Sequence, residues 1–129
     1  METQTATVSK GKLVTGWILS VLPSVLFLLF GAMALAKPPQ VVAGMEHLGY
    51  QVSSALTIGL LEIACAIIYL IPRTSVLGAV LVTGYLGGAT ASHVRIGEPP
   101  IMPLIVAGVF WLGLYLREPR LHSLLPFRK

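Results

Sequence analysis

The sequence predicts an all-α integral membrane protein: a bundle of four transmembrane helices with a short surface helix after the first span. Two observations lead to this prediction. Of the 129 residues, 55% are hydrophobic and only 11% are charged, whereas a soluble domain usually carries about 25% charged residues. The few charges also lie between long apolar runs, which is the pattern of membrane spans. The same composition excludes an ordinary soluble enzyme, and it excludes a disordered tail, which needs high charge and low hydrophobicity.

The first apolar run predicts the first span. Residues 1–12 are polar, and we expect them to form a cytoplasmic tail. Residues 13–36 follow without a charge, and at about 1.5 Å per residue such a helix crosses a hydrocarbon core of about 30 Å. Pro23 lies inside this run and is expected to kink the helix. The lysines before the run and Ala34-Leu35-Ala36 at its end also resemble a secretory signal, but the run is too long for a typical signal core.

Residues 37–52 make up the longest polar connection between apolar runs. Pro38 suits the start of a helix and Gly49 suits its end. Between them, apolar side chains recur at helical spacing, at Val41, Val42, Met45 and Leu48. We therefore expect a short amphipathic helix that lies at the membrane surface.

Three further apolar runs predict the other spans, at residues 53–71, 75–92 and 101–116. The last run is barely long enough to cross the hydrocarbon core, so we expect Arg117 to extend toward the lipid head groups. The four spans together form one transmembrane domain, residues 13–116. Residues 117–129 mix leucines with cations, which is typical of a tail that lies at the cytoplasmic face of the membrane.

The distribution of cations predicts the orientation. Four spans place both termini on the same side of the membrane, and that side holds seven of the nine Lys and Arg residues. The other side holds only Lys37 and Arg95. Because cytoplasmic loops are enriched in Lys and Arg, we expect a multi-pass protein of the cytoplasmic (inner) membrane with both termini in the cytoplasm.

Glu62 is the most informative polar residue, because it lies at the centre of the second predicted span. A carboxyl group at this depth costs a few kcal/mol, so it should face the bundle interior and have a partner. Counting the same depth from His93 into the third span reaches Tyr85, the predicted partner. His93 lies nearer the outer rim and would need an inward-reaching rotamer or a water to contact Glu62. Burial disfavours the charged form, so we expect a neutral carboxyl, with either a structural role or a role in handling a proton or a ligand.

Small residues predict how the helices pack. Gly59 lies on the same helical stripe as Glu62, between alanines, and this stripe is expected to be a close-packing face. Gly84 and Gly88 form a GxxxG pattern in the third span. We expect tight packing inside the bundle at these glycines, with a seat for a ligand or for a second subunit as the alternative.

Five more charged or titratable residues lie on the predicted outer side: Lys37, Glu46, His47, Arg95 and Glu98. They could form a polar vestibule above Glu62 or a solvated membrane edge, and the second is favoured because exposed ion pairs are common and weak. His47 and His93 are conceivable haem or metal ligands. Two isolated histidines do not favour haem, however, and we expect no metal site.

Charge and cysteine content exclude further classes of function. The net charge is +4, but the cations lie between apolar runs and do not cluster with polar and aromatic residues, so we expect no nucleic-acid partner. Cys65 is the single cysteine. An internal disulfide, a CxxC dithiol and a cysteine zinc site are therefore excluded.

The chain resembles the DoxX-like family of small bacterial membrane proteins over residues 14–125. The resemblance lies in three stretches: GWILSVLPSVLFLLFGAMALAKPP, MEHLGYQ and LEIACAIIYLIPRTSVLGAVLVTGYLGGATASHVRIGEP. It implies four transmembrane helices in the bacterial cytoplasmic membrane, and it marks Glu62 and His93 as the polar pair of the family. Most members have no assigned activity, and more distant relatives are linked to thiosulfate:quinone oxidoreduction and to oxidative stress. This chain lacks the cysteines of a sulfur relay.

Three hypotheses for the function follow, and the sequence does not decide whether any reaction is catalysed. In the first, the protein is an accessory subunit associated with membrane redox or quinone chemistry. Glu62 and Tyr85 then handle a proton or a quinone head group, and His93 guards the outer entrance. In the second, it is a non-enzymatic packing or assembly factor. In the third, it is a small-solute carrier that acts as an oligomer. The expected partners are the lipid bilayer and either a membrane redox protein or further copies of the chain.

Overall fold

The computed structural model describes residues 8–128 and is all-helical over that range. This confirms the predicted fold class. The helices are α1 (Lys10–Ala36), α2 (Pro39–Leu48), α3 (Ala55–Leu70), α4 (Ser75–Arg95) and α5 (Ile101–Arg117). Short 3-10 turns occupy Val52–Ser54, Pro72–Thr74 and Pro119–Ser123. Residues 1–7 of the predicted tail, and Lys129, lie outside the described residues.

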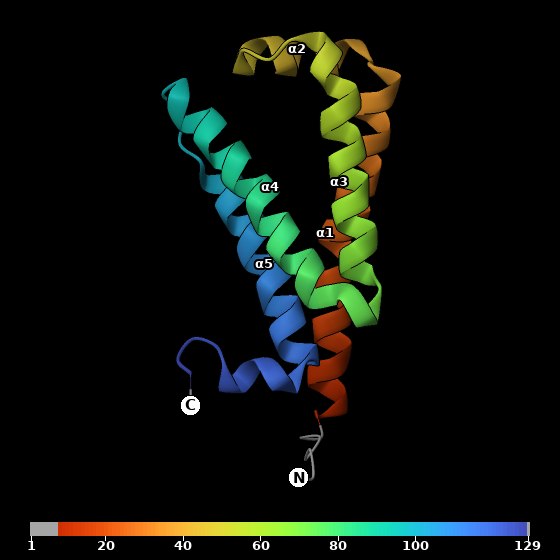
Figure 1. Ribbon diagram of the computed structural model, residues 1–129, viewed down its shortest axis with the longest axis vertical. Helices are drawn as coiled ribbons and strands as arrows, with labels where there is room; N and C mark the ends of the chain where they lie inside the picture. Colours follow the sequence, from red (N-terminus) through yellow and green to blue (C-terminus); the bar gives the residue numbers. More distant parts are fainter. Residues whose placement is uncertain (1–7, 129) are drawn as a thin grey trace.

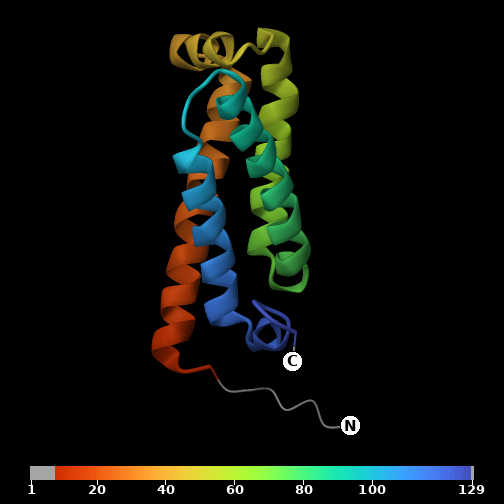
Figure 2. The same ribbon diagram turned by 90° about the vertical axis from the view of Figure 1, so that its left-hand side faces the viewer.

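The four long helices form an antiparallel bundle, as Figure 1 and Figure 2 show. α1 packs against α3 and α5, and α4 packs against the same two helices. α2 lies across one end of the bundle, which we call the α2 end, and both described chain ends lie at the opposite, terminal end. In Figure 1, α4 and α5 diverge from α1 and α3 toward the α2 end. α4 and α5 therefore lie nearest to α1 and α3 at the terminal end.

The long helices have the length and surface of membrane spans. Lys10–Ala36, Val52–Leu70 and Pro72–Arg95 are long and apolar enough to cross a membrane, and Ile101–Arg117 is a shorter apolar helix. Each of the four presents a leucine that is more than half exposed: Leu22, Leu56, Leu77 and Leu104. Apolar side chains that cover the outside of a bundle mark a surface that faces lipid. The α4 helix runs beyond the predicted end at residue 92, because a helix can continue past the edge of the apolar layer.

Close contacts at glycines join neighbouring helices. A Cβ atom at Gly31 would lie 2.9 Å from the Gly59 carbonyl oxygen, so α1 and α3 touch there. A Cβ atom at Gly16 would lie 2.9 Å from the Gly113 carbonyl oxygen, which brings α1 and α5 together at the terminal end. Gly78 of α4 lies directly against the backbone of Tyr69 in α3. Small residues thus allow the close backbone approach that is typical of membrane helices.

Gly84 and Gly88 do not pack in this way. Both are exposed, and a Cβ atom added to either would meet nothing within 4 Å. The expectation that this GxxxG pattern packs inside the bundle is therefore wrong for a single chain, whereas Gly59 does lie buried at a helix contact. The glycine that brings α4 close to a neighbour is Gly78, two helical turns earlier.

A hydrogen-bonded junction joins all four long helices at the terminal end. We call it the four-helix junction, and it consists of Ser20, Tyr69, Ser75 and Arg117. The Arg117 Nε donates to the Ser20 Oγ at 2.8 Å, and the Arg117 Nη1 donates to the Ser75 Oγ at 3.3 Å. The Tyr69 hydroxyl lies 3.0 Å from the Ser20 Oγ and donates to the Phe110 carbonyl at 2.6 Å. Each of the four helices contributes one side chain.

Arg117 therefore points into the bundle, where we had expected it to extend toward the head groups. Its guanidinium carbon lies 4.2 Å from the centroid of the Trp17 ring and 5.2 Å from that of Tyr69. Within residues 8–128 no carboxylate pairs with it, and its Nη2 is buried without a hydrogen-bond partner. The aromatic faces and the serine oxygens hold the positive charge in place of an acid.

Below the junction, the chain ends in a short tail with its own ion pair. Two nitrogens of Arg120 bond the Glu118 carboxylate, at 2.8 Å and 3.1 Å. These hydrogen bonds hold the pKa of Glu118 below its ordinary value. Leu121 is buried against the bundle core, so the tail folds back against the helices.

Replacing Gly78 with alanine should destabilise the bundle by about 1–3 kcal/mol, because the added methyl group would overlap the α3 backbone at Tyr69. The matched control is Gly84→Ala on the same helix, where there is open space, and its effect should stay within about 0.5 kcal/mol. Thermal unfolding in detergent measures both. Equal midpoints for the two variants would contradict the assigned face of α4.

Removing the Tyr69 hydroxyl should cost about 1–2 kcal/mol in unfolding free energy, because Tyr69→Phe deletes the buried hydrogen bonds to the Ser20 Oγ and the Phe110 carbonyl. Tyr115→Phe is the matched control, since among residues 8–128 its hydroxyl makes one long hydrogen bond, of 3.3 Å, to the Leu125 carbonyl. The measurement is equilibrium unfolding in mixed detergent. If Tyr69→Phe proves as stable as Tyr115→Phe, the junction does not hold the helices together.

Candidate functional site

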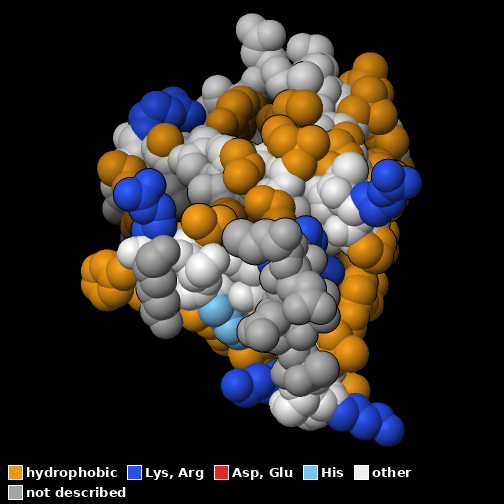
Figure 3. Space-filling view, turned by 60° about the horizontal axis from the view of Figure 1, so that its bottom comes forward, with side chains coloured by type: hydrophobic (Ala, Val, Ile, Leu, Met, Phe, Trp, Pro, Cys, Tyr) orange, Lys and Arg blue, Asp and Glu red, His pale blue; other side chains and the backbone are white. Residues whose placement is uncertain are grey.

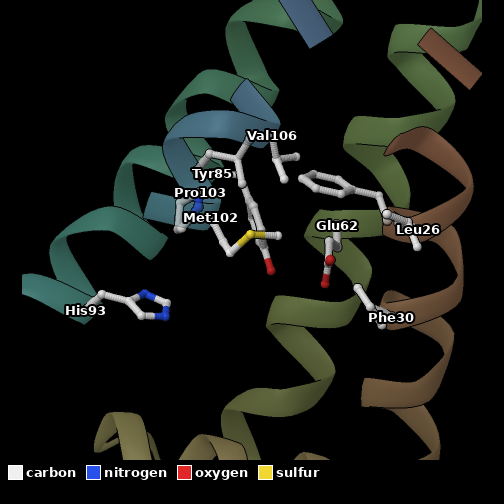
Figure 4. A pocket seen from close by; sticks show the side chains of 10 residues that line it. Leu26, Phe30, Glu62, Tyr85, His93, Met102, Pro103 and Val106 are labelled. Carbon is white, nitrogen blue, oxygen red and sulfur yellow. The ribbon is translucent and has the colours of Figure 1, made fainter. Parts of the chain in front are cut away.

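A cavity of about 320 Å³ lies between the long helices, in the half of the bundle nearer the α2 end (Figure 4). All four long helices contribute to its wall. The lining residues are Leu26, Phe27 and Phe30 from α1, Glu62 from α3, Tyr85, Leu86 and His93 from α4, and Met102, Pro103 and Val106 from α5. Its volume is within the range typical of small-ligand pockets.

Helical spacing explains why these residues share one cavity. In α1, Phe27 and Phe30 are three residues apart, and in α5, Pro103 and Val106 are likewise three apart, so each pair lies on one face of its helix. The Phe27 ring meets the Tyr85 ring edge-to-face, with centroids 5.3 Å apart. It also meets Phe110 at 5.0 Å, which closes the cavity toward the terminal end.

The structure places Glu62 and Tyr85 in the same cavity, as the depth count predicted. Glu62 is only 8% exposed, and its carboxyl and the Tyr85 hydroxyl point into the cavity from α3 and α4 (Figure 4). No Lys or Arg forms an ion pair with Glu62 within residues 8–128. The other polar side chains that line the cavity with this carboxyl are the Tyr85 phenol and the His93 imidazole.

His93 lies about two helical turns beyond Tyr85 on α4, and its ring also points into the cavity (Figure 4). Its Nδ1 lies 2.7 Å from the Ala89 carbonyl oxygen. A carbonyl oxygen only accepts hydrogen bonds, so Nδ1 carries the proton there. In the neutral ring, Nε2 is then left as an acceptor for a donor in the cavity.

The five predicted rim residues do not form one cluster. His47 contacts the Glu98 carboxylate, which links α2 to the turn after α4. Arg95 donates to the Leu48 carbonyl. The side chains of Lys37 and Glu46 are exposed, and neither has a hydrogen bond or an ion pair to another described residue. A solvated edge with ordinary pairs, the favoured expectation, describes this arrangement better than a polar vestibule.

A further contact completes this link. The Tyr50 hydroxyl lies 2.5 Å from the Ser92 Oγ. We call the three contacts together the outer latch: His47 with Glu98, Arg95 with the Leu48 carbonyl, and Tyr50 with Ser92. Gly49 sits inside it with φ +82°, where an added Cβ would be strained and would lie 3.0 Å from the Arg95 guanidinium. The outer latch ties the end of α2 to the outer end of α4.

The cavity combines three hydrogen-bonding groups with an apolar wall. A carboxyl, a phenol and an imidazole can donate and accept hydrogen bonds, while the other seven lining residues are apolar. The sequence pointed to the three polar groups but not to the apolar wall or to Tyr50. In α1 and α5, apolar lining residues recur three and four residues apart in the sequence. Apolar residues occur on every face of a membrane helix, however, so this spacing does not single out the face that lines the cavity.

Comparison with known proteins identifies a family. A family model, described as the DoxX-like family, matches residues 18–113. The matched range includes every residue that lines the cavity. No curated protein and no solved structure matched the chain.

Opening the outer latch should loosen α2 without unfolding the bundle. Glu98→Gln weakens the contact with His47, and because the His47 and Glu98 side chains are 64% and 40% exposed, the change in unfolding free energy should stay below about 1 kcal/mol. Hydrogen exchange should nevertheless become faster in residues 39–50. Glu46→Gln, an exposed position on α2, is the matched control. Unchanged exchange in Glu98→Gln would show that the latch does not hold α2.

Proposed function

Because the chain belongs to the DoxX-like family, we propose that it is a bacterial membrane protein that binds a quinone head group in the cavity. In this proposal it acts as an accessory subunit of membrane redox chemistry, and a separate redox protein supplies or removes the electrons. The observation that supports this most directly is the composition of the cavity: Glu62, Tyr85 and His93 in an otherwise apolar wall. Ligand pockets typically combine apolar walls with a few convergent polar groups.

The donors and acceptors of the cavity suit both redox states of a quinone. The carbonyl oxygens of a quinone accept hydrogen bonds, which the Tyr85 hydroxyl and a neutral Glu62 carboxyl can donate. The hydroxyl groups of a quinol donate hydrogen bonds, which the free Nε2 of His93 can accept. A carboxyl beside the ring is also placed to exchange a proton when the ligand changes redox state.

We further propose that all four long helices cross the cytoplasmic membrane, with both termini in the cytoplasm. In support, Lys and Arg side chains gather at the terminal end of the bundle (Figure 3), as the cytoplasmic enrichment of cations requires. A fluorescent-protein fusion at residue 129 should fluoresce, and a periplasm-dependent phosphatase inserted in residues 40–48 should be active. Activity of the phosphatase when it is fused at residue 129 instead would overturn this orientation.

Binding of quinone analogues tests the proposed function. The probes are 2,3-dimethoxy-5-methyl-1,4-benzoquinone and decylubiquinone, measured by calorimetry on the purified full chain in detergent. Tyr85→Phe and Glu62→Gln should each weaken binding about five- to tenfold, since a hydrogen bond contributes about 1 kcal/mol. Tyr115→Phe and Glu46→Gln are matched controls outside the cavity, and they should bind as the unmodified chain does. Absence of binding by the unmodified chain would refute the proposal.

The packing-factor alternative also has an observation in its favour, because Glu62 is nearly buried and faces a hydroxyl that could satisfy it structurally. The two hypotheses differ for Glu62→Gln in cells that lack the native gene. A structural role predicts that the glutamine variant folds and complements the deletion. Proton handling predicts that it folds and does not complement.

A further inference from the structure

We infer that the cavity is filled from the lipid bilayer, through an opening between α1 and α5, and that its ligand is a lipid-soluble molecule with a polar head and an apolar tail. This deepens the proposed function and rests on it for the identity of the head group. The route and the ligand class follow from how the lining residues are exposed.

The exposed members of the wall all come from two helices. Leu26 is 45% exposed, Phe30 50% and Met102 67%. The lining residues of α3 and α4, which include Glu62 and Tyr85, are buried or half-buried. The cavity therefore has an apolar mouth between α1 and α5, which we call the lateral mouth, and its polar groups lie behind that mouth.

The surface beside the lateral mouth is the surface of a membrane span. Leu29 and Ile105, next to the mouth on α1 and α5, are each 53% exposed. In a bundle whose long apolar helices cross a bilayer, such side chains contact acyl chains. The lateral mouth therefore opens into hydrocarbon, where polar solutes are scarce and lipid-soluble molecules are concentrated.

Packed contacts lie toward both ends of the bundle. Toward the α2 end, the outer latch holds the end of α2 against the outer end of α4. Toward the terminal end, the rings of Phe27, Phe110 and Tyr69 pack edge-to-face at 5.0 Å and 4.9 Å, and the four-helix junction lies below them. A ligand whose head reaches Glu62 would keep its tail in the lateral mouth, between Phe30 and Met102.

The route can be tested without any quinone, by measuring which reagents reach a cysteine thiol placed in the cavity wall. In a Cys65→Ala background, Val106→Cys puts the thiol in the wall, and Leu86→Cys is a second variant in case the first fails to fold. The full chain is reconstituted in liposomes and treated with lipid-soluble pyrene maleimide or with a charged methanethiosulfonate. Leu104→Cys, 58% exposed on the outside of α5, is the control for reagents that reach lipid-facing thiols.

If the cavity fills through the lateral mouth, pyrene maleimide should modify the cavity thiol and the charged reagent should not. Met102→Trp, which narrows the lateral mouth, should slow this modification while leaving that of Leu104→Cys unchanged. Glu98→Gln, which weakens the outer latch, should not accelerate it. Decylubiquinone should also bind at least about tenfold more tightly than the tail-less benzoquinone, because its tail stays among apolar side chains.

Other results overturn the inference. Equal modification by the charged reagent would establish an aqueous route. A rate that Met102→Trp does not change would show that the reagent does not enter by the lateral mouth. Failure of both reagents to modify the cavity thiol while Leu104→Cys reacts would mean that the lateral mouth admits nothing. Each of these results leaves binding of the tail-less benzoquinone intact. A wrong proposed function would give a different result from a wrong entry route: no quinone would bind, although pyrene maleimide would still enter by the lateral mouth.

Discussion

The hydrogen-bonded junction around Arg117 sets how the four long helices meet. Lipid gives helices little hydrophobic reason to associate, so specific polar contacts and close packing must fix their arrangement. Here one cation draws together Ser20 of α1 and Ser75 of α4, while Tyr69 of α3 bonds the α5 backbone at Phe110. The serines and the tyrosine are buried, so none of the helices can leave this end without exposing polar groups to hydrocarbon.

The divergence at the other end follows from where the remaining close contacts lie. α1 and α3 touch again near the α2 end, at Gly31 and Gly59. α4 is held to α3 near the turn that joins them, at Gly78, and to α5 by a hydrogen bond of 2.6 Å from Trp111 to Thr83. The bundle therefore consists of two helix pairs that meet at the terminal end and separate toward α2, and the cavity occupies the space between them.

The sequence predicted the parts of this arrangement that depend on depth, and it missed those that depend on rotation about a helix axis. Apolar runs and flanking cations located the helices, and a count along two antiparallel spans matched Glu62 with Tyr85. Small residues, however, recur around all of α4, so spacing favoured Gly84 although Gly78 makes the contact. The inward turn of Arg117 depends on partners that lie far away in the sequence, which no local pattern reveals.

The position of Glu62 beside open space is what favours a ligand over a purely structural role. A carboxyl in a membrane interior is costly, and a structural role would best be served by enclosing it completely among partners. Instead, Glu62 lines a cavity of about 320 Å³ together with a hydroxyl group and an imidazole. Most of the lining is apolar, so the volume is poorly suited to ordered water, which needs several polar partners. An amphiphile whose polar head meets these three groups, and whose tail meets the apolar wall, satisfies both parts of the cavity at once.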